Sequence, residues 1–453
     1  MPIDPARLVL LAALALLWAA PAAHSETLEE ALAAAYGENP TLRAQRAQLR
    51  ATDERVSQAL GGWRPTLQFE TAIGKQGIET DSRFFTSKEN RTPESYAITL
   101  SQPLFRGGRT VSSTESAKNL VYAGRADLLS VEQSVLLDGT TAYLDVLRDE
   151  AVLDLSRNNE RVLEQHLQAT RDRFEVGDVT RTDVSQAEAR LSQARAERIA
   201  AEGSLVATRS TYQRVIGTMP GTLTWPDVAG TLPASQEQAI EAARARHPTV
   251  EAARFRHLSS EKDIWTATGA LLPEVSLEGS LERLEDRSAR DSLVESARIE
   301  AVLSVPLYQS GAEYSRVREA KEVAGQRRLE IDEAERQTIE ESVQAWEAVD
   351  TARAQVTAFQ DQVAATEVAL DGVQQEQLVG LRTVLDVLDA EQELFVARVN
   401  LVRAQRDVLV SSYRLKAAVG ELSAADLGLP VESYDPILHY EKVRTKLIGL
   451  GGD

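Results

Sequence analysis

The chain has 453 residues, of which 69 are acidic and 50 are basic, so its formal net charge is -19. An acidic chain of this kind repels phosphate backbones and has no basic stripe, which argues against DNA or RNA binding. It contains no cysteine, which excludes disulfides, thiolate metal sites and thiol nucleophiles. With 43% hydrophobic but only 5% aromatic residues, its composition is typical of long alanine-rich helices.

The first 25 residues are predicted to be a signal peptide. Arg7 precedes an apolar run from Leu8 to Ala20, and the segment from Pro21 to Ser25 suits signal-peptidase cleavage. The mature chain is therefore expected to begin near Glu26, outside the cytoplasm. Nothing later in the chain approaches the roughly 18 apolar residues of a membrane-spanning helix, so a mature protein that enters a membrane would need a closed β-barrel.

The rest of the chain is predicted to contain two copies of one structural unit. Repeat 1 covers residues 26–217, a linker follows at 218–235, repeat 2 covers 236–420, and a tail covers 421–453. The tail has no clear periodicity and is expected either to be disordered or to wrap around the helices. The matched segments are Asn39-Pro40 with His247-Pro248, Trp63-Arg64-Pro65 with Leu271-Leu272-Pro273, Gln102-Pro103 with Val305-Pro306, Val176-Gly177 with Val379-Gly380, and Asp183-Val184 with Asp386-Val387.

Each repeat is predicted to run helix, strand hairpin, very long helix, turn and return helix. Pro40 suits the first turn of a helix, as does its counterpart in repeat 2. The strand hairpins are expected at about 66–104 and 274–308, where apolar and polar residues alternate. The stretches 106–175 and 310–376 contain no proline, which predicts helices of roughly 100 Å at 1.5 Å per residue.

The return helix of repeat 2 has a heptad pattern. Its apolar positions are Val387, Leu394, Leu401, Val408 and Leu415, and the small residues three places later are Ala390, Ala397, Ala404, Ser411 and Ala418. This period predicts left-handed supercoiling, and the small residues let backbones approach closely. A second seam, formed by Leu388, Phe395, Val402 and Leu409, predicts that the helix contacts two neighbours. In repeat 1 the heptad pattern is less regular, because Arg198 occupies a position where an apolar residue is expected.

The duplicated plan, the V-G-x-x-T-x-x-D-V turns and the segment 380–390 (GLRTVLDVLDA) resemble the TolC-like outer-membrane efflux protein family. The tail segment 426–430 (DLGLP) is similar to that of α-proteobacterial members. The resemblance implies an α+β membrane protein and a homotrimer. Two hairpins supply four strands per chain, too few to close a barrel alone. Three chains would form a 12-stranded β-barrel, continued by a long α-helical coiled-coil periplasmic tunnel.

The resemblance also implies a function in the outer membrane of a Gram-negative bacterium. Members of the family form the exit duct of tripartite efflux or type I secretion systems, passing substrates from the periplasmic side to the exterior. Their partners are a periplasmic adaptor (membrane fusion) protein, an inner-membrane transporter and the lipid of the outer membrane. No enzymatic activity, cofactor or metal is implied, and the sequence does not identify the cargo.

Candidate gate residues follow from the same resemblance. In the family an acidic pair forms rings that constrict the periplasmic entrance, and the matching residues are Asp386 and Asp389. Like charges held together attract cations and raise one another's pKa. Arg382 matches an arginine that holds the closed state, whereas the aromatic partner found a few residues earlier is Gln377 in this chain. The alternative for Asp386 is a helix-capping role, as for its counterpart Asp183.

The helix turns are the candidate adaptor-docking site. Val176 and Gly177 mark the turn in repeat 1, and Val379 and Gly380 mark the turn in repeat 2. Each glycine also has a plain structural explanation as a C-cap that needs a positive φ.

Two other classes of protein remain open. An exported coiled-coil scaffold without a channel would stay soluble without detergent, and its four strands would form a soluble sheet covered by helices. An enzyme would need clusters of polar residues in a catalytic frame, which the sequence lacks. His166, His247, His257 and His439 have no metal-ligand spacing, and solvent-facing or N-terminal helix positions account for them.

Overall fold

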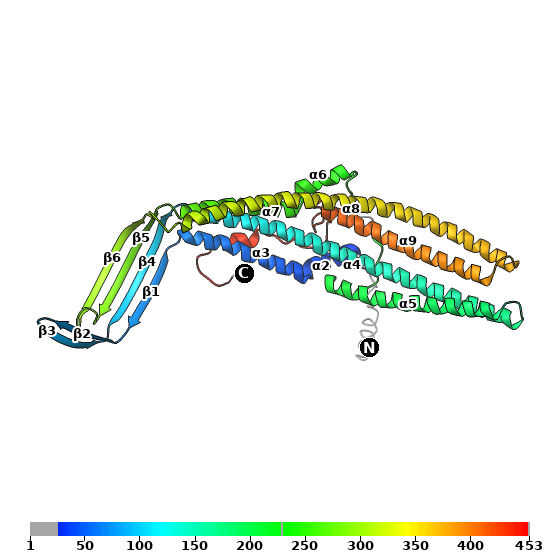
Figure 1. Cartoon of the computed structure of the whole chain (residues 1–453), viewed down its shortest axis with the longest axis horizontal. Helices are drawn as coiled ribbons and strands as arrows, with labels where there is room; N and C mark the ends of the chain where they lie inside the picture. The colour runs from blue at the N-terminus through cyan, green and yellow to red at the C-terminus, as the bar shows by residue number, and fades with distance from the viewer. Residues whose placement is uncertain (1–25, 228–229, 452–453) are drawn as a thin grey trace, which may run out of the picture. The chain divides into compact units, whose positions relative to one another are not determined.

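The computed structural model describes residues 26–227 and 230–451, so the expected signal peptide at 1–25 lies outside the described residues (Figure 1). Helices dominate the described chain, and strands form a smaller part. None of the described helices combines the length and the apolar character needed to cross a membrane. In chain order the elements are α2 (Leu28–Glu38), α3 (Pro40–Leu60), the 3-10 turn η1 (Gly61–Trp63), β1 (Thr66–Ile73), β2 (Gln76–Ser82), β3 (Phe85–Arg91), β4 (Glu94–Arg106), α4 (Arg109–Glu175), α5 (Arg181–Ile216), α6 (Gln236–Arg246), α7 (Pro248–Gly269), β5 (Glu274–Glu285), β6 (Leu293–Ser304), α8 (Ala312–Leu378), α9 (Val384–Ala418) and α10 (Leu438–Val443).

The chain divides into two compact units. The first contains the described residues of Met1–Ala44, Leu129–His247 and Gln337–Tyr434, and the second contains those of Gln45–Leu128, Pro248–Arg336 and Asp435–Asp453.

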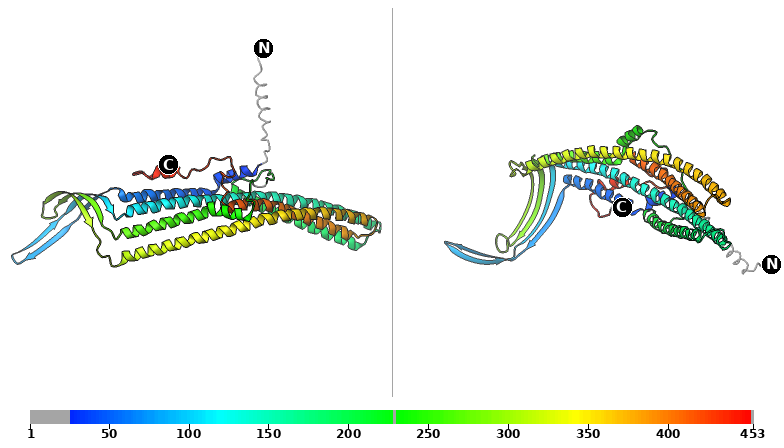
Figure 2. Two further views of the ribbon diagram at one scale, coloured as in Figure 1. Left: turned by 90° about the horizontal axis from the view of Figure 1, so that it is seen from above. Right: turned by 45° about the vertical axis from the view of Figure 1, so that its right-hand side comes forward.

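The first unit contains two antiparallel helix hairpins, α5 with α4 from Leu129 onward and α9 with α8 from Gln337 onward, and the right-hand view in Figure 2 shows the two members of each pair side by side. In α4–α5, Arg209 pairs with Glu150 at 2.8 Å. Arg198, which breaks the heptad of repeat 1, donates to Glu160 of α4 at 2.5 Å. A polar residue is tolerated at that position because its charge is paired across the hairpin.

The two seams predicted for α9 contact different neighbours. Val387 and Leu394 pack against Leu370 of α8. Leu388, from the second seam, packs instead against α4 and α5. The prediction that this helix contacts two neighbours at once is confirmed for these residues.

The second unit contains a four-stranded antiparallel sheet in the order β1-β4-β5-β6. Its register aligns the apolar positions across the strands, because Leu67 lies opposite Leu100, Leu100 opposite Gly279, and Gly279 opposite Ile299. The next row on that face is Phe69, Ile98, Leu281 and Ala297. Between these rows lie the polar residues Gln68, Thr99, Ser280 and Arg298, which point to the opposite face. The predicted alternation therefore produces one apolar and one polar face.

The strand prediction was incomplete. The loop between β1 and β4 forms a further hairpin, β2–β3, which pairs only with itself among the described strands. Most residues of this hairpin are polar and lack the alternation that marks the other strands, so the sequence pattern did not indicate it. The last predicted strand also ends early, at Ser304 instead of 308, just before Pro306, which has no N–H to donate.

The helical segment before each hairpin consists of two helices, and the second begins at the proline expected in a first helical turn. In repeat 1, α2 ends before Asn39 and α3 begins at Pro40. The side chain of Asn39 accepts a hydrogen bond from the N–H of Thr41 at 2.9 Å, which caps α3. The residue before a proline avoids the helical conformation, so the break follows from Pro40. The counterpart break lies between His247 and Pro248.

The described tail residues of the second unit, 435–451, contain the helix α10. His439 hydrogen-bonds through Nδ1 to the buried carboxylate of Asp53 in α3 at 3.0 Å. Burial raises the pKa of Asp53, and the neighbouring His439 and Arg125 oppose that shift. His439 lies at the N-terminal end of α10, which is one of the two kinds of position expected for the histidines, and its ring is largely buried against a carboxylate.

Candidate functional site at the turns of the helix hairpins

The two helix turns have the same backbone construction. Gly177 has φ +83° and its N–H donates to the carbonyl of Phe174, while Gly380 has φ +80° and its N–H donates to the carbonyl of Gln377. These are C-cap glycines, so the left-handed φ alone accounts for the residue type. The neighbouring valines have no such role, because Val176 is 81% exposed and Val379 is 71% exposed. Each turn thus presents an apolar side chain to solvent.

Each return helix begins with a capping box. The N–H of Thr180 donates to Asp183, and the N–H of Thr383 donates to Asp386, both at 2.8 Å. The threonine hydroxyls accept the reciprocal hydrogen bonds. Asp386 therefore has the capping role considered above. Its hydrogen bonds from Thr383 hold the pKa of its carboxyl below the ordinary value, so the carboxylate is ionised at neutral pH.

Arg382 is engaged within its own hairpin. Its Nε donates to Glu376 at 2.8 Å, and this hydrogen bond raises the pKa of the guanidinium. No hydrogen bond or ion pair from Arg382 to α4 or α5 is present in the described residues. The structure thus brings Arg382 to the end of α8 and not to the other hairpin.

Asp389 connects the two hairpins. Its carboxylate forms an ion pair with Nη2 of Arg190 in α5, and both side chains are part-exposed. The adjacent Leu388 is 1% exposed and packs on the other hairpin. Its neighbours there are Leu163, Leu167, Ala187, Leu191 and Ala194.

The packing of Leu388 outweighs the ion pair in energy. A part-exposed ion pair contributes at most about 1 kcal/mol, because water screens the charges. Truncating a buried leucine to alanine costs about 2–5 kcal/mol. The apolar contact therefore accounts for most of the attraction between the hairpins at this level, and the ion pair mainly determines where the charges lie.

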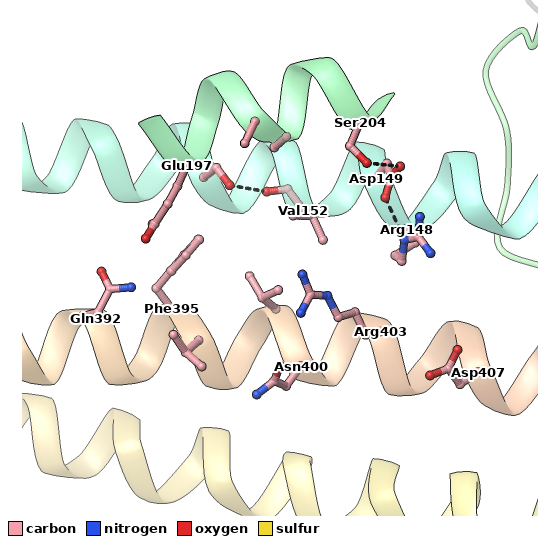
Figure 3. Close-up of a pocket in the computed structure, with 15 residues that line it drawn as sticks. Arg148, Asp149, Val152, Glu197, Ser204, Gln392, Phe395, Asn400, Arg403 and Asp407 are labelled. Carbon is pink, nitrogen blue, oxygen red and sulfur yellow. Dashed lines mark hydrogen bonds and ion pairs between the residues drawn. The ribbon is translucent and has the colours of Figure 1, made fainter. Parts of the chain in front are cut away.

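A pocket of about 650 Å³ lies further along the same pair of hairpins (Figure 3). Phe395 and Arg403 of α9 line one side, and Asp149 of α4 lines the other, where it accepts hydrogen bonds from Arg148 at 2.7 Å and Ser204 at 2.9 Å. On that side, Arg148, Asp149 and Ser204 are thus paired with one another. Among residues 26–227 and 230–451, no group of three or more His, Asp or Glu residues is arranged to hold a metal ion.

Two long helix hairpins and a sheet with one apolar face are the parts of an outer-membrane channel protein with a helical extension. The family model of the outer membrane efflux protein matches residues 31–218 and 239–421. The chain belongs to this family.

Individual relatives agree with this assignment. The outer membrane efflux protein BepC of Brucella suis biovar 1 is 36% identical over 430 residues, covering 95% of this chain and 93% of BepC. The outer membrane protein TolC of Vibrio cholerae is 26% identical, covering 74% of this chain and 78% of TolC. The crystal structure of the Campylobacter jejuni CmeC outer membrane channel has the same fold, with a TM-score of 0.79 at 15% identity, covering 92% of this chain and 89% of CmeC.

The predicted family and location are thereby confirmed. The protein is an outer-membrane channel of the efflux and secretion type, and its long helices are of the kind that extends into the periplasm in this family.

Proposed function

We propose that the protein works as a homotrimer, in which three copies of the β1-β4-β5-β6 sheet close a 12-stranded barrel and the helix hairpins form a periplasmic tunnel. The observation that carries this proposal is the sheet itself, whose outer strands β1 and β6 have no further partner among the described residues. Unpaired edges pair readily with another chain. Three four-stranded sheets provide enough strands for a barrel with an open channel.

The apolar face of the sheet supports contact with lipid. Phe69 of β1 is 63% exposed and Ile299 of β6 is 81% exposed, although both are large and apolar. A soluble sheet would cover such residues with helices, whereas a membrane barrel turns them towards the acyl chains. The polar row through Thr99, Ser280 and Arg298 would then face the lumen.

The two-repeat organisation remains part of the proposal, with repeats at 26–217 and 236–420, a linker at 218–235 and a tail at 421–453. It is supported by the two successive segments that match the family model. The equivalent capping boxes at Thr180 and Thr383 are consistent with it.

The periplasmic entrance is proposed to lie at the helix turns, with Asp386 as its main acidic group, Asp389 as a second and Arg382 beside them. In a trimer, three copies of each aspartate would surround the axis and favour cations. The exposed Val176 and Val379, next to their glycines, are proposed as contacts for a periplasmic adaptor, which connects the duct to an inner-membrane transporter. In this proposal the transporter would supply the energy and the duct would supply the path.

Single-channel recording tests the duct. The mature protein is extracted in detergent, its mass is measured by light scattering, and it is added to a planar lipid bilayer. A mass of three chains with a steady cation-selective conductance supports the proposal. A monomer that gives no conductance would contradict it and favour the exported scaffold.

The first mutational prediction concerns Asp386. Asp386→Asn is expected to weaken the block by a trivalent cation added on the periplasmic side by about tenfold or more, because three carboxylates are removed from one ring. Asp183→Asn is the matched control, since it removes the equivalent capping carboxylate from repeat 1. Equal changes in both variants would mean that helix capping, not the ring, explains the effect. Asp386→Asn combined with Asp389→Asn is expected to weaken the block further.

A further inference from the structure

The ion pair between Asp389 and Arg190 changes the electrostatics of the entrance. Asp389 lies on α9 and Arg190 on α5, 199 residues apart in the chain, so the pair exists only while the two hairpins are together. Nη1 of Arg190 also donates to Gln193 on its own helix at 3.3 Å, which orients the guanidinium. Asp389 is half-exposed, and its carboxylate already faces a cation of the same chain.

Asp386 differs from Asp389 in this respect. Its hydrogen-bond donors are the backbone N–H and the hydroxyl of the neutral Thr383, both at 2.8 Å, and the nearby cation Arg382 is itself hydrogen-bonded to Glu376. These hydrogen bonds keep the negative charge, whereas an arginine cancels it. The two aspartates of the segment are therefore not electrostatically equivalent when the hairpins are in contact.

We propose that Arg190 is a charge mask for Asp389, meaning that its positive charge compensates this carboxylate while the hairpins are in contact. The closed entrance would then present one aspartate per chain outside an ion pair, and would gain a second when α9 moves away from α5. The entrance would become more attractive to cations as it opens. The residue that tunes this property lies in the first hairpin, outside the acidic segment. The inference rests on the proposed position of the two aspartates at the entrance.

Leu388 couples the mask to the contact between the hairpins. It precedes Asp389 and is buried among residues of α4 and α5. Loosening this contact would withdraw Asp389 from Arg190 without altering any charge. Arg190→Gln and Leu388→Ala should thus have the same electrostatic effect by different routes.

The test measures block by a trivalent cation, hexaamminecobalt, in the whole trimer in a bilayer. Arg190→Gln is expected to strengthen the block several-fold, and addition of Asp389→Asn is expected to cancel that gain. Arg195→Gln is the matched control, because Arg195 is a cation on the same helix whose partners, Glu160 and Glu164, lie within its own hairpin. The mask is refuted if Arg190→Gln and Arg195→Gln change the block equally, or if Asp389→Asn does not cancel the gain.

A second measurement does not depend on conductance. Because the chain has no cysteine, spin labels can be placed at Ala189→Cys on α5 and Glu393→Cys on α9, both exposed positions. Leu388→Ala is expected to lengthen the distance between the labels and to strengthen the block, and Asp389→Asn should cancel only the change in block. A longer distance with unchanged block would overturn the mask. Unchanged block in Asp386→Asn would instead reject the proposed entrance, so the two failures are distinguishable.

Discussion

Gly107→Ala is expected to destabilise the protein by about 2–5 kcal/mol, the largest effect we expect from adding a single methyl group. Gly107 has φ +60°, which costs about 1–2 kcal/mol for a residue with a Cβ. A Cβ there would also lie 2.2 Å from the carbonyl oxygen of Gly269, at the end of α7. Overpacking of this kind costs about 1–3 kcal/mol, and a backbone carbonyl cannot move aside as a flexible side chain can.

The neighbouring glycine provides the control. Gly108 has φ +78°, but a Cβ at that position would meet nothing within 4 Å. Gly108→Ala should therefore cost only the backbone term, about 1–2 kcal/mol. Thermal unfolding of both variants in the same detergent, followed by circular dichroism, measures the difference. Equal melting temperatures would show that the contact between Gly107 and Gly269 adapts to the extra atom.

The long elements could be predicted because their signals are local. The stretch 106–175 lacks proline, and the helix found there, α4, runs from Arg109 to Glu175. The turn after it is marked by a glycine with positive φ and by a threonine three residues before an aspartate, a capping box that can be read directly from the chain. Strict alternation likewise predicted the two faces of the sheet.

What could not be predicted depends on contacts between distant segments. The pairing of Arg190 with Asp389 leaves no periodic trace, because each residue is an ordinary charged position on its own helix. The pocket lined by Phe395 and Arg403 likewise requires two hairpins to be placed side by side. Family resemblance supplied Asp389 as a candidate but not its partner. The contact with Arg190 determines whether the charge of Asp389 is free or neutralised.

The difference in charge compensation between Asp386 and Asp389 affects how a passive duct can select its cargo. A ring that is half neutralised when closed attracts fewer cations than six free carboxylates would, so it is less easily blocked at rest. Separation of the hairpins would then restore the missing charge at the time when cargo passes. In this proposal, one ion pair couples selectivity to opening.

The second large effect is expected from a charge placed on the apolar face of the sheet. Ile299→Lys is expected to destabilise the membrane-inserted protein by about 2–4 kcal/mol per chain, the cost of a lysine facing lipid near the bilayer midplane. Ile299 lies in the middle of β6, opposite Gly279, and is 81% exposed. Since the opposing glycine has no side chain, no neighbour in the strand pair can shield the ammonium group.

Glu300→Lys is the matched control, because the adjacent residue points to the opposite face of the same strand. It also introduces a lysine, but on the face proposed to line the aqueous lumen, where a charge is solvated. Folding of both variants into lipid vesicles, titrated with urea, measures the two costs. A greater loss in Glu300→Lys would mean that the faces are reversed, and equal small losses would mean that this sheet does not contact lipid. A loss confined to Ile299→Lys would support the shared barrel, because lipid can lie only on its outer side.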